Sequence, residues 1–176
     1  LTLRANLTYQ NTEVLDMDEA ANELWYRMSR GFRQGQTRGF IALGLFKDQA
    51  DIDQSPSQDN LANFPILPGD IKYKDVNGDG VITEDDIVPI GYKNTPGIMY
   101  GFGLSASWRG WGLNMLFQGA GKRDFFVGGN GPHAFHDGAT GNILQRMVVE
   151  DRWIPAEISG TTDTEDPNAL WPRLTY

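Results

Sequence analysis

The chain contains no cysteine among its 176 residues, which excludes a disulfide framework, thiol chemistry and a zinc-thiolate site. It has no run of about 18 apolar residues, so no transmembrane helix is predicted, and no signal peptide opens it. Basic side chains are few: 15 Lys and Arg stand against 23 Asp and Glu, which gives a net charge of −8. Such a surface as a whole repels phosphate, which argues against a general nucleic-acid-binding or anionic-membrane surface and suits a cation-binding, extracytoplasmic face.

The residues that are abundant favour an all-β fold. Gly accounts for 21 residues and aromatic residues for 11% of the chain. Residues 1–10 alternate between apolar and polar side chains, which predicts a strand with one apolar face. Because Leu1 already lies inside this pattern, we expect the chain to be a piece of a larger protein.

Residues 98–119 carry the clearest strand pattern, and they predict a β-hairpin with a tight turn at Arg109-Gly110. Each strand is about as long as the 9–11 residues that a tilted strand needs to cross a bilayer. The apolar face fits a second sheet in a soluble sandwich, and it fits lipid in an outer-membrane barrel. One very short turn beside very long loops favours the barrel.

The long loop region 11–97 contains a 12-residue segment, 75–86, with the spacing of a calcium loop. Alternate oxygen-bearing positions converge on one cation in such loops, and a glycine at the sixth position permits the turn. The closing residue is Asp where the general pattern has Glu, and the alternative is an acidic turn without a metal. No amphipathic helix flanks the segment, so we expect Ca²⁺ to rigidify a loop. The predicted ligands are Asp75, Asn77, Asp79, Val81 (through its carbonyl), Thr83 and Asp86.

Other segments give weaker predictions. The charge order of residues 16–29 predicts a short helix, residues 38–46 look extended, and one helix is predicted within 139–152. No nucleophile elbow or triad spacing appears, so no catalytic residue and no enzyme activity are predicted. His133 and His136 are expected to lie in a surface loop, with a metal or acid/base site formed together with Asp137 as the alternative. Trp153 and Trp171 are candidates for stacking on a sugar ligand, with apolar anchoring of a loop as the alternative.

Several of these segments together resemble one family. The segment Pro68-Gly-Asp-Ile-Lys-Tyr-Lys-Asp-Val-Asn-Gly-Asp-Gly-Val-Ile82 is very similar to one in SusC/RagA-like TonB-linked outer-membrane transporters. Ile90-Gly91, Pro96, the hairpin from Tyr100 to Gly119, and the segments 151–155 and 166–174 follow in the order of that family. Thr83 and Thr95-Pro-Gly depart from its usual pattern.

The resemblance implies a fragment of the C-terminal β-barrel, which has roughly 22 strands, with long extracellular loops at 11–97 and 120–176. It implies import of oligosaccharides or peptides across the outer membrane, with a SusD-like lipoprotein as partner. TonB would act through an N-terminal part that lies outside this chain. The alternative is a secreted, soluble calcium-binding module for carbohydrate binding or adhesion.

Overall fold

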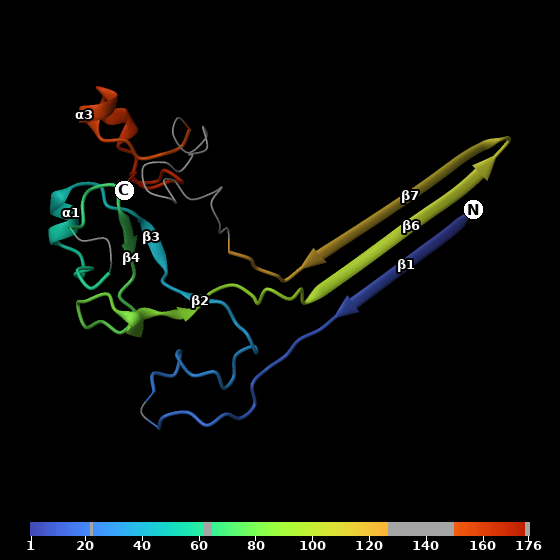
Figure 1. The fold of residues 1–176 in the computed structure, drawn as a ribbon, viewed down its shortest axis with the longest axis horizontal. Helices are drawn as coiled ribbons and strands as arrows, with labels where there is room; N and C mark the ends of the chain where they lie inside the picture. Colours follow the sequence, from blue (N-terminus) through green and yellow to red (C-terminus); the bar gives the residue numbers. More distant parts are fainter. Residues whose placement is uncertain (22, 62–64, 127–149, 175–176) are drawn as a thin grey trace, which may run out of the picture. The chain divides into compact units, whose positions relative to one another are not determined.

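The computed structural model describes residues 1–21, 23–61, 65–126 and 150–174 (Figure 1). The chain divides into two compact units. We call Leu1–Gly39 with Pro89–Phe125 the strand unit, and Phe40–Val88 with Phe126–Tyr176 the loop unit. The regular elements are mostly strands in antiparallel pairs, in agreement with the all-β prediction.

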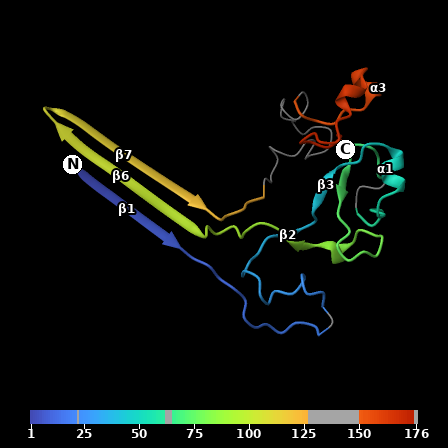
Figure 2. The same ribbon diagram turned by 180° about the vertical axis from the view of Figure 1, so that it is seen from behind.

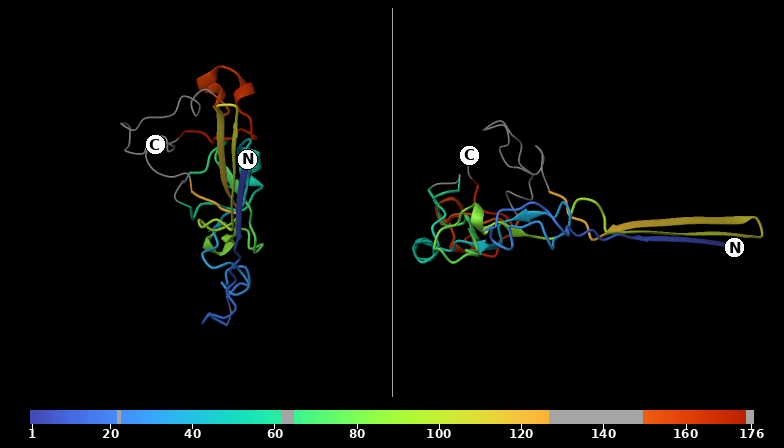
Figure 3. Two further views of the ribbon diagram at one scale, coloured as in Figure 1. Left: turned by 90° about the vertical axis from the view of Figure 1, so that its right-hand side faces the viewer. Right: turned by 90° about the horizontal axis from the view of Figure 1, so that it is seen from below.

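The strand unit contains a three-stranded antiparallel sheet in the order β1-β6-β7. The strands are β1 (Thr2–Tyr9), β6 (Ile98–Trp108) and β7 (Trp111–Gly121). Figure 2 shows the three strands side by side from behind, and both views of Figure 3 agree. The strand predicted at 1–10 and the hairpin predicted at 98–119 are both confirmed, and β1 adds to the hairpin as a third strand.

The register of the sheet places all the alternating apolar residues on one face. Leu3 lies opposite Leu104, which lies opposite Met115, and Ala5 is likewise aligned with Phe102 and Phe117. Directly opposite residues of an antiparallel pair point to the same face of the sheet. The rows between these carry the polar and small residues, for example Thr2, Ser105 and Asn114. The sheet therefore has one apolar and one largely polar face.

The turn between β6 and β7 consists of two residues, Arg109 and Gly110. Both have positive φ, 47° and 85°, and Trp108 pairs directly with Trp111 across the turn. Positive φ at both central residues is typical of the type I′ turn, whose twist matches that of the flanking strands. This turn fixes the register of the hairpin.

The two long segments of the chain leave the sheet at the end away from this turn. Tyr9, at the end of β1, pairs with Ile98, at the start of β6, and Ile98 pairs with Gly121, at the end of β7. The two long segments therefore connect to the sheet at this last row. Backbone bonds from Gln10 to Gly97 (2.8 Å) and from Gly97 to Lys122 (3.1 Å) continue the ladder by one step. Residues 11–97 and 120–176 therefore both leave the sheet at the same end, opposite the short turn.

The loop unit is built from short elements around a small core. Strands β3 (Ala42–Leu45) and β4 (Ile71–Tyr73) pair antiparallel, and Leu45, Trp153 and Ala169 form a buried cluster with Ile71 packed against it. The remaining elements are α1 (Gln49–Asp53), η1 (Glu84–Asp86), α3 (Ala156–Ser159) and η3 (Thr162–Thr164). A separate two-stranded sheet, which is not part of this core, pairs β2 (Arg38–Gly39) with β5 (Val88–Pro89).

The helix predicted at residues 16–29 is wrong. The described residues of this segment form turns and irregular chain. Its acidic side chains bind partners at the other end of the segment: Asp16 accepts a bond from Arg30 (2.8 Å), and Glu19 accepts one from the backbone N–H of Ser29. Acids placed early and Arg placed late thus close a loop, although the same order suits a helix dipole.

Two further points concern helices. The helix predicted within 139–152 falls almost entirely outside the described residues. Of the helices that the structure describes, none is long and apolar enough to cross a membrane.

Candidate functional site

The first half of the segment 75–86 is folded by its own side chains. The carboxylate of Asp75 accepts bonds from the backbone N–H of Gly78 (2.6 Å) and Gly80 (2.8 Å). Asn77 accepts from Asp79 N–H at 3.0 Å, and Asp79 accepts from the N–H of residue 81 at 2.9 Å. Gly80 has φ of 85°, in the left-handed region that a side chain disfavours. The spacing of the segment therefore produces a tight coil around its acidic side chains.

Asp86 closes this coil from within. Its side chain is fully buried and accepts bonds from the N–H groups of Val76 (2.7 Å) and Thr83 (2.9 Å). The side chain of Thr83 in turn accepts from Asp85 N–H at 3.2 Å, which caps η1. A buried carboxylate needs such donors. Asp86 therefore has a structural role in this fold, which its position in the motif did not reveal.

The electrostatics of the coil suit a cation. The N–H groups of Gly80 and Gly78 lower the pKa of the Asp75 carboxyl below its ordinary value, because they stabilise its charged form. Asn77 and Asp79 are exposed and Asp75 is half-buried. Among the described residues, no three His, Cys, Asp or Glu side chains are grouped as in a ready-made metal site. The Ca²⁺ ligands therefore remain a prediction. Three of the six predicted ligands are carboxylates; the other three are the side-chain amide of Asn77, the carbonyl of Val81 and the hydroxyl of Thr83.

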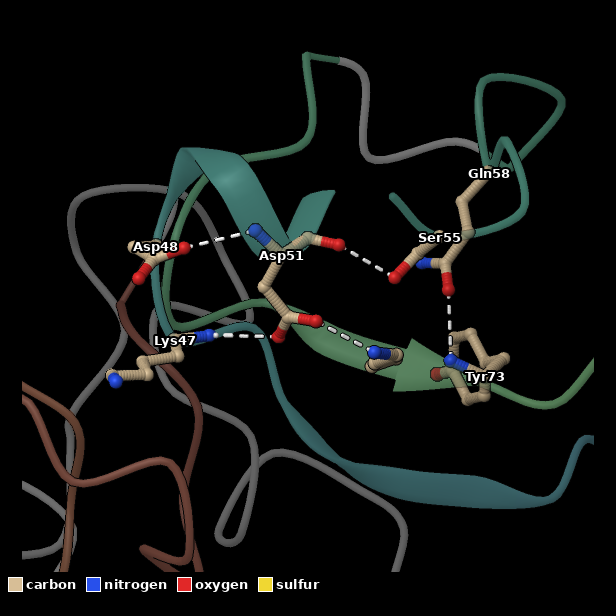
Figure 4. A network of polar contacts seen from close by, with 7 residues as sticks. Lys47, Asp48, Asp51, Ser55, Gln58 and Tyr73 are labelled. Carbon is tan, nitrogen blue, oxygen red and sulfur yellow. Dashed lines mark hydrogen bonds and ion pairs between the residues drawn. The ribbon is translucent and has the colours of Figure 1, made fainter. Parts of the chain in front are cut away.

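A neighbouring segment ties the coil to the core of the loop unit. Ser57 donates its N–H to Gly80 (3.0 Å) and accepts from Ile82 N–H (2.7 Å), and Ile82 is fully buried. The amide of Gln58, 3% exposed, donates to the carbonyl of Ile71 (3.0 Å) and accepts from Tyr73 N–H (2.8 Å). Gln58 thus pairs with the edge of β4 as a strand would (Figure 4). Nothing in the sequence distinguishes this glutamine from other polar loop residues.

The side of β4 near α1 is held by the carboxylate of Asp51 (Figure 4). It accepts bonds from Nζ of Lys72 at 2.7 Å and from the backbone N–H of Lys47 at 3.2 Å. Asp48 caps α1 by accepting from Asp51 N–H at 2.9 Å. The bond from Lys72 lowers the pKa of Asp51 most, against burial, which raises it. Asp51 therefore joins α1 to β4 through an ion pair.

The two tryptophans proposed for sugar stacking lie in or beside the core of the loop unit. Trp153 is 4% exposed, and its ring covers Gly69, where an added Cβ would lie 2.3 Å from a ring carbon. Its backbone N–H donates to the carbonyl of Trp171, which is half-buried. Trp153 also lines a cleft of about 410 Å³ with Lys47, Leu67 and Glu165. The burial of Trp153 favours the anchoring role that the sequence left open.

His133 and His136 lie outside the described residues.

The apolar face of the β1-β6-β7 sheet is exposed over its length. Leu3 and Leu7 are each 73% exposed, Phe102 and Leu113 each 50%, and Phe117 46%. Phe102 and Phe117 stack with centroids 4.6 Å apart, and Trp108 and Trp111 lie at the turn. An apolar face that the described residues leave uncovered marks a surface that meets something apolar.

A scan against protein-family models finds no match to the chain. A comparison with curated proteins finds a TonB-dependent receptor, P26 of Formosa agariphila, that is 33% identical over 135 residues. The chain is similar to a segment of that receptor. The matched part covers 77% of this chain and 12% of the receptor, so the chain spans about an eighth of the length of the relative it matches.

Proposed function

We propose that the chain is part of the transmembrane β-barrel of a TonB-dependent outer-membrane transporter. The observation that carries this is the sheet β1-β6-β7, in which three strands align one continuous apolar face and one polar face. Strands of 11 residues span a bilayer when tilted, with apolar residues toward lipid and polar residues toward the lumen. The similarity to a segment of a TonB-dependent receptor supports the same assignment.

The finer assignment is to the SusC/RagA-like transporters, importing oligosaccharides or peptides with a SusD-like lipoprotein. The order of the motifs from Pro68 to Leu174 supports it. In this proposal the Arg109-Gly110 turn is periplasmic, the segments 11–97 and 120–176 are extracellular, and TonB acts through the part of the transporter before this chain. The lipoprotein would dock near the extracellular segments, and transport itself would be driven by the whole protein.

Within the extracellular part, we propose that the segment 75–86 binds Ca²⁺ and braces the loop unit. Asp75, Asn77 and Asp79 supply side-chain oxygens from a coil that their own hydrogen bonds preform. The carbonyl of Val81 and the hydroxyl of Thr83 remain proposed ligands. The burial of Asp86 makes its first role the closure of the coil. Hard oxygen ligands of this kind are those that Ca²⁺ prefers.

Calcium titration of the complete transporter by isothermal calorimetry tests the brace. Asp79→Ala removes an exposed, charged, predicted ligand. We expect it to abolish the heat of Ca²⁺ binding while leaving the fold intact. Asp163→Asn, at an exposed aspartate in η3, is the matched control and should leave the heat unchanged. If the unmodified transporter gives no heat of Ca²⁺ binding, the proposed Ca²⁺ site at 75–86 is wrong.

Surface access tests the transporter assignment and its orientation. An epitope tag inserted at Asn60, in an exposed turn, is expected to bind antibody on intact cells. Gln58 is a poor insertion point, because its side chain holds β4. Access only after the outer membrane is opened would contradict the orientation. Release of the protein to the medium, monodisperse without detergent, would favour the secreted calcium-binding module instead.

A further inference from the structure

The apolar face of the sheet carries a cation stacked on an aromatic ring at each of its ends. At the turn, the guanidinium carbon of Arg109 lies 4.8 Å from the ring centroid of Trp108. At the opposite end, Nζ of Lys122 lies 5.0 Å from the ring centroid of Tyr9. By register both rings belong to the apolar face, and they are 68% and 59% exposed. Each cation is therefore held beside a margin of that face.

Between the two margins the apolar face has no charged side chain. Arg4, the charged residue within β1, belongs to the opposite face, since it pairs with Gly103. The rows from one margin to the other hold only apolar side chains: Leu3, Ala5, Leu7, Tyr100, Phe102, Leu104, Ala106, Leu113, Met115 and Phe117. Aromatic rings and long basic side chains take this arrangement where a surface passes from hydrocarbon to lipid headgroups.

The two cations have no ion-pair partner among the described carboxylates. The acid nearest in sequence to Lys122 is Asp124, and it accepts the backbone N–H of Tyr92. The residue between them is a second base, Arg123, which donates to the amide oxygen of Asn94 at 3.2 Å. The margin at Lys122 is thus locally basic in a chain whose net charge is −8. A phosphate group is the anion that lipid presents at this level.

We propose that Lys122, held over Tyr9, is a contact site for the phosphate of an anionic lipid headgroup, with Arg109 over Trp108 as its counterpart in the other leaflet. This rests on the proposed function, because it requires the apolar face to meet lipid. The ring holds the ammonium at the margin of the apolar face, and the lipid supplies the missing negative charge. The two pairs then fix the depth of the hairpin in the bilayer.

Lipid retention by the complete transporter tests this proposal. The transporter is placed in nanodiscs of phosphatidylcholine mixed with phosphatidylglycerol, and native mass spectrometry counts the retained phosphatidylglycerol. Lys122→Gln is expected to lower its relative retention about fivefold, the factor for about 1 kcal/mol per basic residue at an anionic surface. Tyr9→Leu keeps the face apolar but releases the ammonium, and about a twofold loss is expected. Lys47→Gln, at an exposed lysine of the loop unit, is the matched control.

Three results would overturn the proposal. If the Lys122→Gln and Lys47→Gln variants both insert in nanodiscs and retain equal amounts of phosphatidylglycerol, the lipid contact is refuted and the proposed function is not. If inorganic phosphate abolishes the difference in phosphatidylglycerol retention between the unmodified transporter and Lys122→Gln, the site binds free phosphate rather than a lipid headgroup. Failure of the unmodified transporter to insert would overturn the proposed function, and the lipid contact with it.

Discussion

We expect loss of the ion pair between Asp70 and Arg173 to destabilise the loop unit strongly. Nε of Arg173 donates to one carboxylate oxygen of Asp70 at 2.7 Å, and Nη2 of Arg173 donates to the other at 3.2 Å. Asp70 also accepts the N–H of Leu67 at 2.9 Å. The pair joins residues 103 positions apart, so it closes a long stretch of chain. Asp70→Asn removes the charge and leaves the shape almost unchanged.

The structure sets the size of the effect. The side chains are 8% exposed for Asp70 and 19% exposed for Arg173, so the variant leaves a nearly buried guanidinium without its counter-ion. Removing one partner of a buried pair costs about 3–5 kcal/mol. Because Arg173 keeps some contact with water and Asn still accepts one bond, we expect the lower limit, about 3 kcal/mol. That corresponds to a roughly 100-fold larger population of the locally opened state.

Proteolysis of the complete transporter under native conditions measures this population. At low protease concentration the cleavage rate within 150–174 follows the equilibrium fraction of opened molecules. Asp163→Asn is the matched exposed control. A rate for Asp70→Asn no higher than that of Asp163→Asn would refute the argument. Adding Arg173→Gln to Asp70→Asn should cost less than the sum of the single changes, because the unpaired charge is then removed as well.

Two further predictions concern single contacts. Gly119→Ala should lower the yield of folded transporter, because the new Cβ would lie 2.2 Å from the Tyr100 ring, and Tyr100→Ala should restore it; heat-modifiable gel mobility reports both. The folded-state pKa of Asp51 is lowered, so its stabilisation is present above the unfolded value of 3.8 and is lost as pH falls through the lower folded value. The hydrogen-exchange protection factors in 47–61 and 65–73, which are corrected for the intrinsic pH dependence of exchange, should therefore fall on acidification, and Lys72→Gln should remove that fall.

Local pattern predicted the strands of the β1-β6-β7 sheet well. The two-residue turn and the alternation on both sides of it determine the register of β6 with β7, so the hairpin follows from residues 98–119 alone. The strand at 1–10 follows from its own alternation as well. Its position beside β6 does not, because the paired residues are 89 (Tyr9 and Ile98) to 103 (Thr2 and Ser105) positions apart in the sequence and no local signal links them.

The loop unit was less predictable, because long-range polar contacts hold it together. Gln58 caps the edge of β4, and Asp70 pairs with Arg173, yet each is an ordinary polar residue in its local sequence. The same holds for residues 16–29 of the strand unit, whose acids suit a helix dipole equally well and instead close a loop. The position of Asp86 predicts a metal ligand, and its burial adds a structural role that only the folded chain shows.

The orientation of β7 in the membrane tests the central proposal most directly. The chain has no cysteine, so each introduced thiol is unique within it. In the complete transporter in outer membranes, Leu113→Cys and Phe117→Cys should react with a lipid-soluble maleimide and resist a charged, water-soluble reagent. Asn114→Cys and Gln118→Cys should show the opposite preference. Labelling of all four by the charged reagent, or shielding of Leu113→Cys and Phe117→Cys from both as in a sandwich core, would contradict a barrel strand.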